Sequence, residues 1–191
     1  MGVPFVPARV DLNADVGEMV SGGPPGSDLA LIPYITSANI ACGFHAGDPG
    51  VMRATVEFAR EHGVAVGAHP GFPDPEGFGR RELQFSPGDV EDFVAYQIGS
   101  LAAIAAALGV RLQHVKPHGA LFNMAVRDAA LADAIARAAV VIDRTLILFG
   151  LPGSEILAAG KRAGLRTAGE GFADRAYQPD GTLVPRQQPG A

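Results

Sequence analysis

Tryptophan is absent from this sequence of 191 residues, and cysteine occurs once, at Cys42. A single cysteine excludes a disulfide within the chain and is typical of a reducing compartment, so we expect a cytoplasmic protein. Basic residues are also few, since 15 Lys and Arg stand against 20 Asp and Glu and give a formal net charge of −5. We therefore expect no nucleic acid partner. The amino terminus lacks the basic start and apolar run of a signal peptide.

Several motifs of hydrolases and nucleotide-binding proteins are missing as well. The sequence contains no HExxH, no CxxC and no GxSxG, which argues against the zinc-protease and serine-hydrolase classes. A Gly/Pro-rich loop at residues 21–27 could cradle a phosphate, but it lacks the Lys-Ser/Thr ending of a Walker motif. Because Cys42 lies in an apolar segment, we expect a buried thiol rather than a nucleophile.

One long segment, residues 93–110, carries no charge and raises the question of a membrane span. It is rich in alanine and includes Gln97, and its larger apolar residues recur at helical spacing on one face: Val94, Ile98, Leu101, Ala105 and Leu108. This pattern is typical of a helix that packs on a protein core, so we expect no membrane partner.

What the chain does contain is a repeated unit: a helix, a glycine, an apolar strand, and polar residues where the strand ends. Gly63, Gly109 and Gly164 mark three such units. Strands are predicted at residues 9–15, 37–42, 64–68, 111–116, 145–149 and 165–168. Their alternation with helices indicates right-handed crossovers and a parallel sheet. We predict a single α/β barrel domain across residues 1–191, with core units over 9–175 and a turn-rich tail over 176–191.

The stretch RLQHVKPHGALFN at residues 111–123 shows how a unit ends. Pro117 cannot donate a ladder hydrogen bond, so the strand should stop with Lys116 on its last rung and His118 just beyond. Because parallel strands end at the same edge of a sheet, the polar residues at all the strand ends should converge on one rim. The predicted set is Asp11, Asn13, Asp15, His45, His69, Lys116, His118, Glu170 and Asp174.

These residue types support several chemistries. Histidines titrate near neutral pH and can exchange protons with a substrate. Carboxylates can act as bases, orient histidines or bind a divalent metal, and the sequence leaves the metal open. Lysine and arginine can bind phosphate or stabilise an oxyanion. We assign catalysis to Asp11, Asp15, His69, Lys116, His118 and Glu170. We assign substrate or nucleotide binding to Asn13, Asn39, His45, Asn123, Asp174 and Arg175.

Six segments resemble the LamB/YcsF family, in order and at matching spacing: DLNADVGE (residues 11–18), SANIACGFHAGDP (37–49), GAHPGFPD (67–74), GFGRR (77–81), QHVKPHGALFN (113–123) and FADRAYQPDGTLVPR (172–186). The resemblance implies a (β/α) barrel of the glycoside hydrolase/deacetylase type. It also implies ATP-dependent hydrolysis of 5-oxoproline to glutamate, with Mg²⁺ accompanying ATP, together with 5-oxoprolinase subunits B and C. Members of the family continue past residues 187–191 with a further helix and strand, so we expect an incomplete barrel.

Three functions stay open at this point. In ATP-coupled lactam hydrolysis, phosphorylation of the lactam oxygen would create an imidate that water attacks, with Lys116 and Arg175 neutralising phosphate charge. Lys116→Ala would then abolish turnover and leave thermal stability nearly unchanged. The second function is a metal-dependent deacetylase with a carboxylate, His45 and His69 as ligands. The third is an incomplete barrel that binds the other subunits without catalysis.

Overall fold

The structure, a computed structural model, describes residues 10–19 and 27–191. The Gly/Pro-rich loop at residues 21–27 lies outside this part of the chain except for its last residue. The elements follow in the order β1 (Asn13–Val16), η1 (Ser27–Tyr34), β2 (Ser37–Ala41), α1 (Pro49–Glu61), β3 (Ala65–His69), α2 (Pro87–Ala107), β4 (Leu112–Val115), α3 (Gly119–Ala125), α4 (Ala129–Ile142), β5 (Ile147–Gly150), α5 (Glu155–Arg162) and β6 (Arg166–Gly169).

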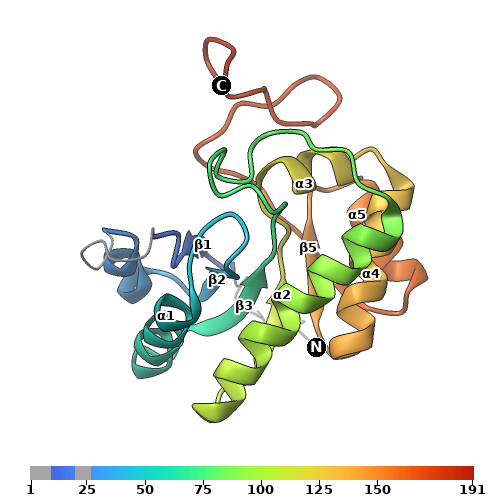
Figure 1. Cartoon of the computed structure of the whole chain (residues 1–191). Helices are drawn as coiled ribbons and strands as arrows, with labels where there is room; N and C mark the ends of the chain where they lie inside the picture. Colours follow the sequence, from blue (N-terminus) through green and yellow to red (C-terminus); the bar gives the residue numbers. More distant parts are fainter. Residues whose placement is uncertain (1–9, 20–26) are drawn as a thin grey trace, which may run out of the picture.

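All five strand pairings are parallel, and the six strands lie in the sheet in chain order. Crossovers of one hand between neighbouring strands place the helices on one side of such a sheet. Accordingly, α1 packs beside α2, α2 beside α4, and α4 beside α5, around the outside of the strands (Figure 1). The predicted parallel α/β fold is confirmed. Within the described residues, the sheet is open between β1 and β6.

The capping residues of α1 and α2 are those that the sequence indicates. Asp48 caps α1 by accepting a hydrogen bond from the amide of Val51 at 2.9 Å, and Pro49 occupies the first turn. Ser86 and Asp89 form a capping box at the start of α2. The glycines of the repeated unit follow α1, α2 and α5 and have φ angles of 68°, 72° and 79°.

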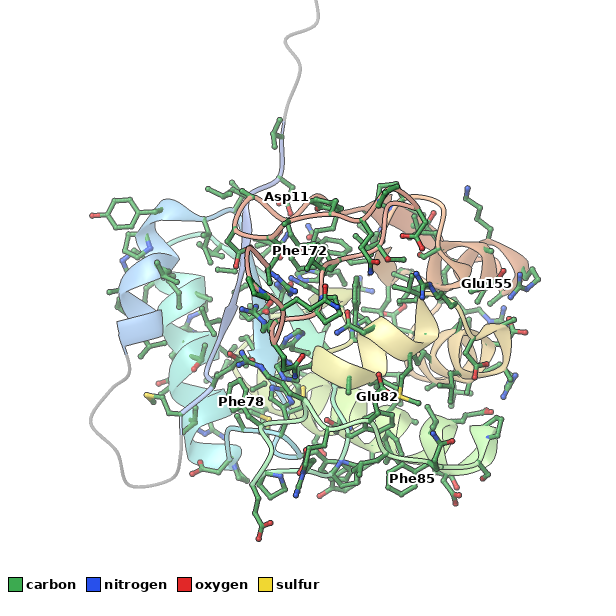
Figure 2. The ribbon with its side chains drawn as sticks, turned by 90° about the horizontal axis from the view of Figure 1, so that it is seen from above. Asp11, Phe78, Glu82, Phe85, Glu155 and Phe172 are labelled. Atoms are coloured by element: carbon green, nitrogen blue, oxygen red, sulfur yellow. The ribbon has the colours of Figure 1, made fainter. Side chains whose placement is uncertain are left out.

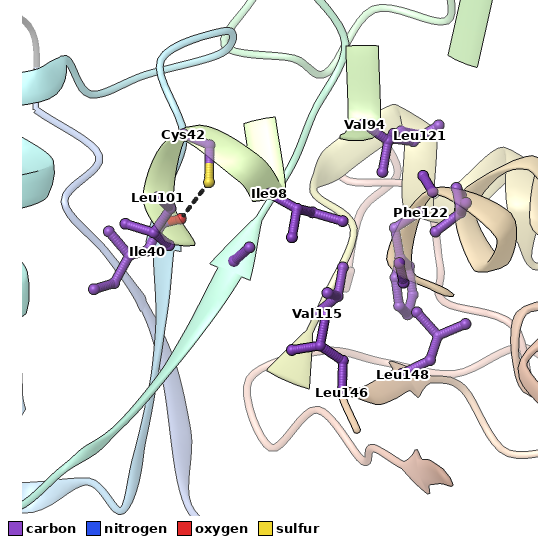
Figure 3. Packing of buried hydrophobic residues seen from close by; sticks show 14 of the residues in the cluster. Ile40, Cys42, Val94, Ile98, Leu101, Val115, Leu121, Phe122, Leu146 and Leu148 are labelled. Atoms are coloured by element: carbon purple, nitrogen blue, oxygen red, sulfur yellow. Dashed lines mark hydrogen bonds between the residues drawn. The ribbon is translucent and has the colours of Figure 1, made fainter. Parts of the chain in front are cut away.

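The core lies between the helices and the outer face of the sheet. Helix α2 is long and apolar enough to cross a membrane by length and composition. Its Val94, Ile98 and Leu101 are fully buried in the hydrophobic core, and α2 contacts α4, β3 and β4 (Figure 3). Each large aliphatic side chain buried in this way contributes about 1.5–3 kcal/mol. This packing is that of a core helix, as predicted.

Cys42 lies in the same core. Its thiol donates a hydrogen bond to the carbonyl of Ile40 at 3.1 Å, drawn as the dashed line in Figure 3. Burial raises the pKa of Cys42 to about 12. A thiol that stays protonated at neutral pH is a poor nucleophile, which agrees with the prediction of a buried, non-catalytic cysteine.

Helix α3 was not predicted. The sequence pattern places a strand end and a turn before Asn123, whereas the chain enters a helix directly after His118. The amide of Ala120 donates to the carbonyl of Gly79 at 2.9 Å, so the start of α3 is tied to a loop about 40 residues earlier. Its buried face, with Leu121 and Phe122, turns this short segment inward over the carboxyl end of β4.

Candidate active site

The inner face of the sheet is polar, and its side chains form hydrogen-bonded layers. Asp15, Asn39, Gly67 and His114 are paired from strand to strand across β1 to β4. The Asn39 amide donates to Asp15 Oδ1 at 2.8 Å, and Asn39 Oδ1 accepts from His114 Nε2 at 2.7 Å. A Cβ at Gly67 would lie 2.2 Å from His114 Nε2, so only glycine leaves room for this ring. The layer supports the residues above it, at the carboxyl ends of the strands.

Lys116 is the centre of the next layer and is only 4% exposed. Its Nζ donates to Asn13 Oδ1 and Asp15 Oδ1, both at 3.1 Å, and to Glu170 Oε1 at 2.7 Å. The ring of Phe172 lies 4.9 Å from the ammonium and covers it. Burial opposes the charged form of Lys116, but the attraction of Asp15 and Glu170 outweighs it and raises the pKa. Lys116, directly after β4, thus joins β1 to Glu170, directly after β6, through the barrel interior.

Asp15 connects this layer to a group of three histidines. Its Oδ2 lies 3.4 Å from His69 Nε2. Burial alone would raise the pKa of Asp15, but His69 and Lys116 hold it well below its usual range. The same contact raises the pKa of His69 in spite of its burial. Asp15 is therefore ionised at neutral pH and lies between Lys116 and His69.

The three histidines, His45, His69 and His118, surround the carboxylate of Glu18. We call these four residues the histidine cluster. One carboxylate oxygen of Glu18 lies 3.2 Å from His45 Nε2, 3.2 Å from His118 Nδ1 and 3.7 Å from His69 Nε2. His45 and His118 stack with ring centroids 3.7 Å apart. Burial lowers the pKa of His45 to about 4. For Glu18, burial is outweighed by hydrogen bonds from His118 and His45, which bring its pKa to about 2.

A cavity of about 330 Å³ opens at this end of the barrel, a size that suits a small ligand. Figure 2 is viewed from this end, with Phe78 and Phe172 labelled beside the centre. Asp15, Glu18, His69, Lys116 and His118 line the cavity. Its outer wall includes four arginines, Arg80, Arg127, Arg175 and Arg186, of which Arg127 is paired with Asp180. Burial and the charges of Arg186 and Arg80 lower the pKa of Arg175, as expected for cations held close together.

Most of the predicted site residues meet here. Asp15, His69, Lys116, His118 and Glu170 belong to the two connected groups, as do Asn13, Asn39 and His45 from the binding set. Asn123 and Arg175 line the cavity. Asp174 is exposed and is not among the residues that line it.

Asp11 is the clear exception. β1 begins two residues later, at Asn13, so Asp11 precedes the strand at its amino-terminal end. Asp11 Oδ1 accepts hydrogen bonds from the hydroxyls of Thr36 and Ser37, both at 2.7 Å, at the start of β2. The prediction that Asp11 lies on the rim is wrong, because the alternating pattern began before the strand itself. Its position indicates that it ties the ends of two strands together.

Sequence reasoning missed Glu18 and the buried His114 as parts of the site. The signal for Glu18 was its place after Gly17, whose φ of 69° turns the chain back over the end of β1. His114 shares a strand face with Lys116, two residues on, and that alternation indicated an inward position. Phe172 and Arg80 carried no signal of their own, since both reach the cavity from loops.

The fold and the site together define a parallel α/β barrel with a polar centre at the carboxyl ends of its strands. The sequence pattern of the LamB/YcsF family matches residues 10–191, and the chain belongs to this family. A relative from Tolumonas auensis, named as the A subunit of 5-oxoprolinase, is 60% identical over 184 residues, which cover 96% of this chain and 73% of the relative. A protein of the same name from Bacillus subtilis is 58% identical over 183 residues, or 96% of this chain and 71% of that protein.

A solved structure agrees with this assignment. The crystal structure of the lactam utilization protein from Thermus thermophilus matches with a TM-score of 0.91 and 50% sequence identity. The match covers 96% of this chain and 74% of that one. The fold and the family inferred from the sequence are both confirmed.

Proposed function

We propose that this chain takes part in the ATP-dependent hydrolysis of 5-oxoproline to glutamate, as one component of an enzyme that also contains subunits B and C. The observation that carries the proposal is the cavity, where Asp15, His69 and Lys116 meet an outer wall of arginines. The names of the relatives, the A subunit of 5-oxoprolinase and the lactam utilization protein, support the same substrate class.

The chemistry explains why ATP is needed. A lactam is a stable amide, so its oxygen first attacks the terminal phosphorus of ATP, with Mg²⁺ bound to the nucleotide, and ADP leaves. Water then adds to the ring carbon, the carbon–nitrogen bond breaks, and the nitrogen takes up a proton. A second water releases phosphate from the acyl phosphate. Each step develops negative charge on oxygen, which nearby cations stabilise.

The contacts suggest a division of roles among the cationic residues. The three N–H groups of Lys116 already donate to Asn13, Asp15 and Glu170, so the lysine chiefly holds two carboxylates in place. The arginines of the outer wall have planar donors that match a carboxylate or a phosphate, and we assign them the anionic groups of the substrate. Asp15 is ionised and lines the cavity, and we assign it the role of orienting the attacking water.

Reconstitution with subunits B and C tests the proposal. The complete assembly should form glutamate and phosphate only when both 5-oxoproline and ATP are present. The isolated chain should show little or no such turnover, because it lacks a Walker motif. Asp15→Asn should lower the rate by about 100-fold or more. Asp92→Asn, at an exposed carboxylate on α2, is the control and should have wild-type activity.

Two results would overturn the proposal. One is a complete assembly that consumes no 5-oxoproline. The other is an assembly with Asp15→Asn that turns over as fast as the one with Asp92→Asn.

A further inference from the structure

The histidine cluster has a hydrogen-bond pattern that protons alone satisfy poorly. The Nδ1 atom of His69 lies 2.7 Å from the carbonyl oxygen of Lys116. The Nε2 atom of His118 lies 2.8 Å from the carbonyl oxygen of Phe78. A carbonyl can only accept a hydrogen bond, so each of these nitrogens must carry a proton. In a neutral ring, the other nitrogen then has a lone pair.

Those two remaining nitrogens face each other. His69 Nε2 and His118 Nδ1 are 3.0 Å apart, and both lie beside the carboxylate of Glu18. Two lone pairs at this distance repel unless a cation lies between them or one ring takes an extra proton. Histidines that bind a metal commonly donate their second N–H to a backbone carbonyl, which orients the ring and fixes its tautomer. Both rings have this arrangement.

The spacing of the four candidate ligand atoms fits a small ion. Glu18, His45, His69 and His118 each offer one atom, and all four atoms lie within 4.8 Å of one another. Four of the six distances among them are 3.0, 3.2, 3.2 and 3.7 Å, and the other two, from His45 to His69 and to His118, are at most 4.8 Å. Ligand bonds of about 2.0–2.1 Å in a tetrahedron place neighbouring ligand atoms about 3.3 Å apart. Four of the six ligand-to-ligand distances are therefore close to those of a tetrahedral site before any ion is considered.

We propose that Glu18, His45, His69 and His118 bind one divalent first-row transition metal ion, with Zn²⁺ as the best fit. Three imidazoles and one carboxylate suit Zn²⁺ and its neighbours, whereas Mg²⁺ prefers oxygen ligands. The site is thus chemically distinct from the Mg²⁺ that accompanies ATP. An ion here, beside Asp15, would polarise a carbonyl oxygen or acidify a bound water in the cavity. The binding itself does not depend on the proposed reaction.

The surrounding loop is built to hold these rings. Phe78, whose carbonyl orients His118, has a φ of 54°, which costs energy for a bulky residue and is found mostly at functional sites. A Cβ at Gly79 would lie 2.7 Å from His45 Cβ and 2.8 Å from His118 Cδ2. The GFGRR segment therefore supplies both the carbonyl and the free space that the stacked rings require.

Metal binding can be measured directly on the purified chain. After treatment with a chelator and dialysis, ZnCl₂ should titrate calorimetrically to about one ion per chain, and elemental analysis should give the same ratio. Saturating Zn²⁺ should raise the melting temperature, because an ion that binds only the folded state stabilises it. MgCl₂ at the same concentration should do neither.

Variants then locate the site. Glu18→Gln and His118→Gln introduce side chains of similar size. Each should weaken Zn²⁺ binding by more than about 100-fold, because loss of a group that only hydrogen-bonds to a ligand already costs about 10–100-fold. His62→Gln, at an exposed histidine after α1, should bind like the wild type. Circular dichroism verifies that each variant is folded.

Two results would overturn the proposed metal site. If the cluster holds only a shared proton, the folded wild-type chain will bind no Zn²⁺ and its melting temperature will not change. Wild-type affinity in both Glu18→Gln and His118→Gln would also overturn the proposal, since the ion would then be bound elsewhere.

Discussion

Replacing Lys116 by methionine should destabilise the protein severely. Methionine fills a similar volume but leaves Asp15 and Glu170 without the ammonium that lies 3.1 and 2.7 Å from them. From the sequence we expected Lys116 to meet a phosphate or an oxyanion, and its loss to leave thermal stability nearly unchanged. That expectation no longer holds, because the lysine is 4% exposed and Glu170 is nearly buried as well.

The magnitude follows from the burial of the partners. Removing one member of a buried ion pair costs about 3–5 kcal/mol, because a charge stays behind without compensation. The side chain of Asp15 is 35% exposed and can be partly hydrated, so we expect the lower end, about 3 kcal/mol. In a chain of this size, that loss lowers the melting temperature by about 6–12 °C.

The pH dependence provides a second readout. Without Lys116, the pKa of Asp15 should rise from its depressed value, while His69 still lowers it. A carboxyl group with a depressed folded-state pKa contributes stability above its unfolded value, about 3.9, and loses that contribution as the pH falls through the folded value. Because Lys116→Met loses part of this contribution, its stability deficit should be smaller at about pH 3 than at pH 7.

Urea unfolding followed by circular dichroism at both pH values measures these quantities. Lys161→Met, at the other lysine of the chain and exposed on α5, is the matched control and should change stability by less than about 0.5 kcal/mol. Adding Glu170→Gln to Lys116→Met should restore part of the loss. The reasoning fails if Lys116→Met unfolds at the same urea concentration as Lys161→Met at pH 7.

Two further predictions concern buried groups. Burial lowers the pKa of His114 to about 4, whereas it titrates near 6.5 when unfolded, so its contribution is present above pH 6.5 and is lost as the pH falls towards 4. Between pH 7 and pH 5 the unfolding free energy of the wild type should fall by about 2 kcal/mol more than that of His114→Gln. Urea unfolding that gives the same change with pH for both proteins would contradict this. Cys42, with a pKa raised to about 12 by burial, should not react with a thiol reagent in the native protein and should react fully in denaturant. Rapid labelling at neutral pH without denaturant would show that the thiol is accessible.

Local pattern determined the elements of this protein and the end of the sheet where its polar residues meet. Periodicity and the glycines after the helices located the units, because helix ends and strand lengths depend on nearby residues. Pro117 ended β4 as expected, so that Lys116 and His118 lie at its carboxyl end. The rule that parallel strands end together then brought His69, Lys116 and Glu170 into one site.

Tertiary structure decided which polar residues actually touch, since that depends on register and on loops distant in sequence. The pairing of Asn13 with Ser37 leaves Asp11 outside the cavity, whereas the turn at Gly17 brings Glu18 into the histidine cluster. His118 is oriented by the carbonyl of Phe78, 40 residues away. No local pattern encodes such distances, because they result from the packing of whole elements in the barrel. The sequence therefore indicated a reactive rim, and only the folded chain separated it into a lysine centre and a candidate metal centre.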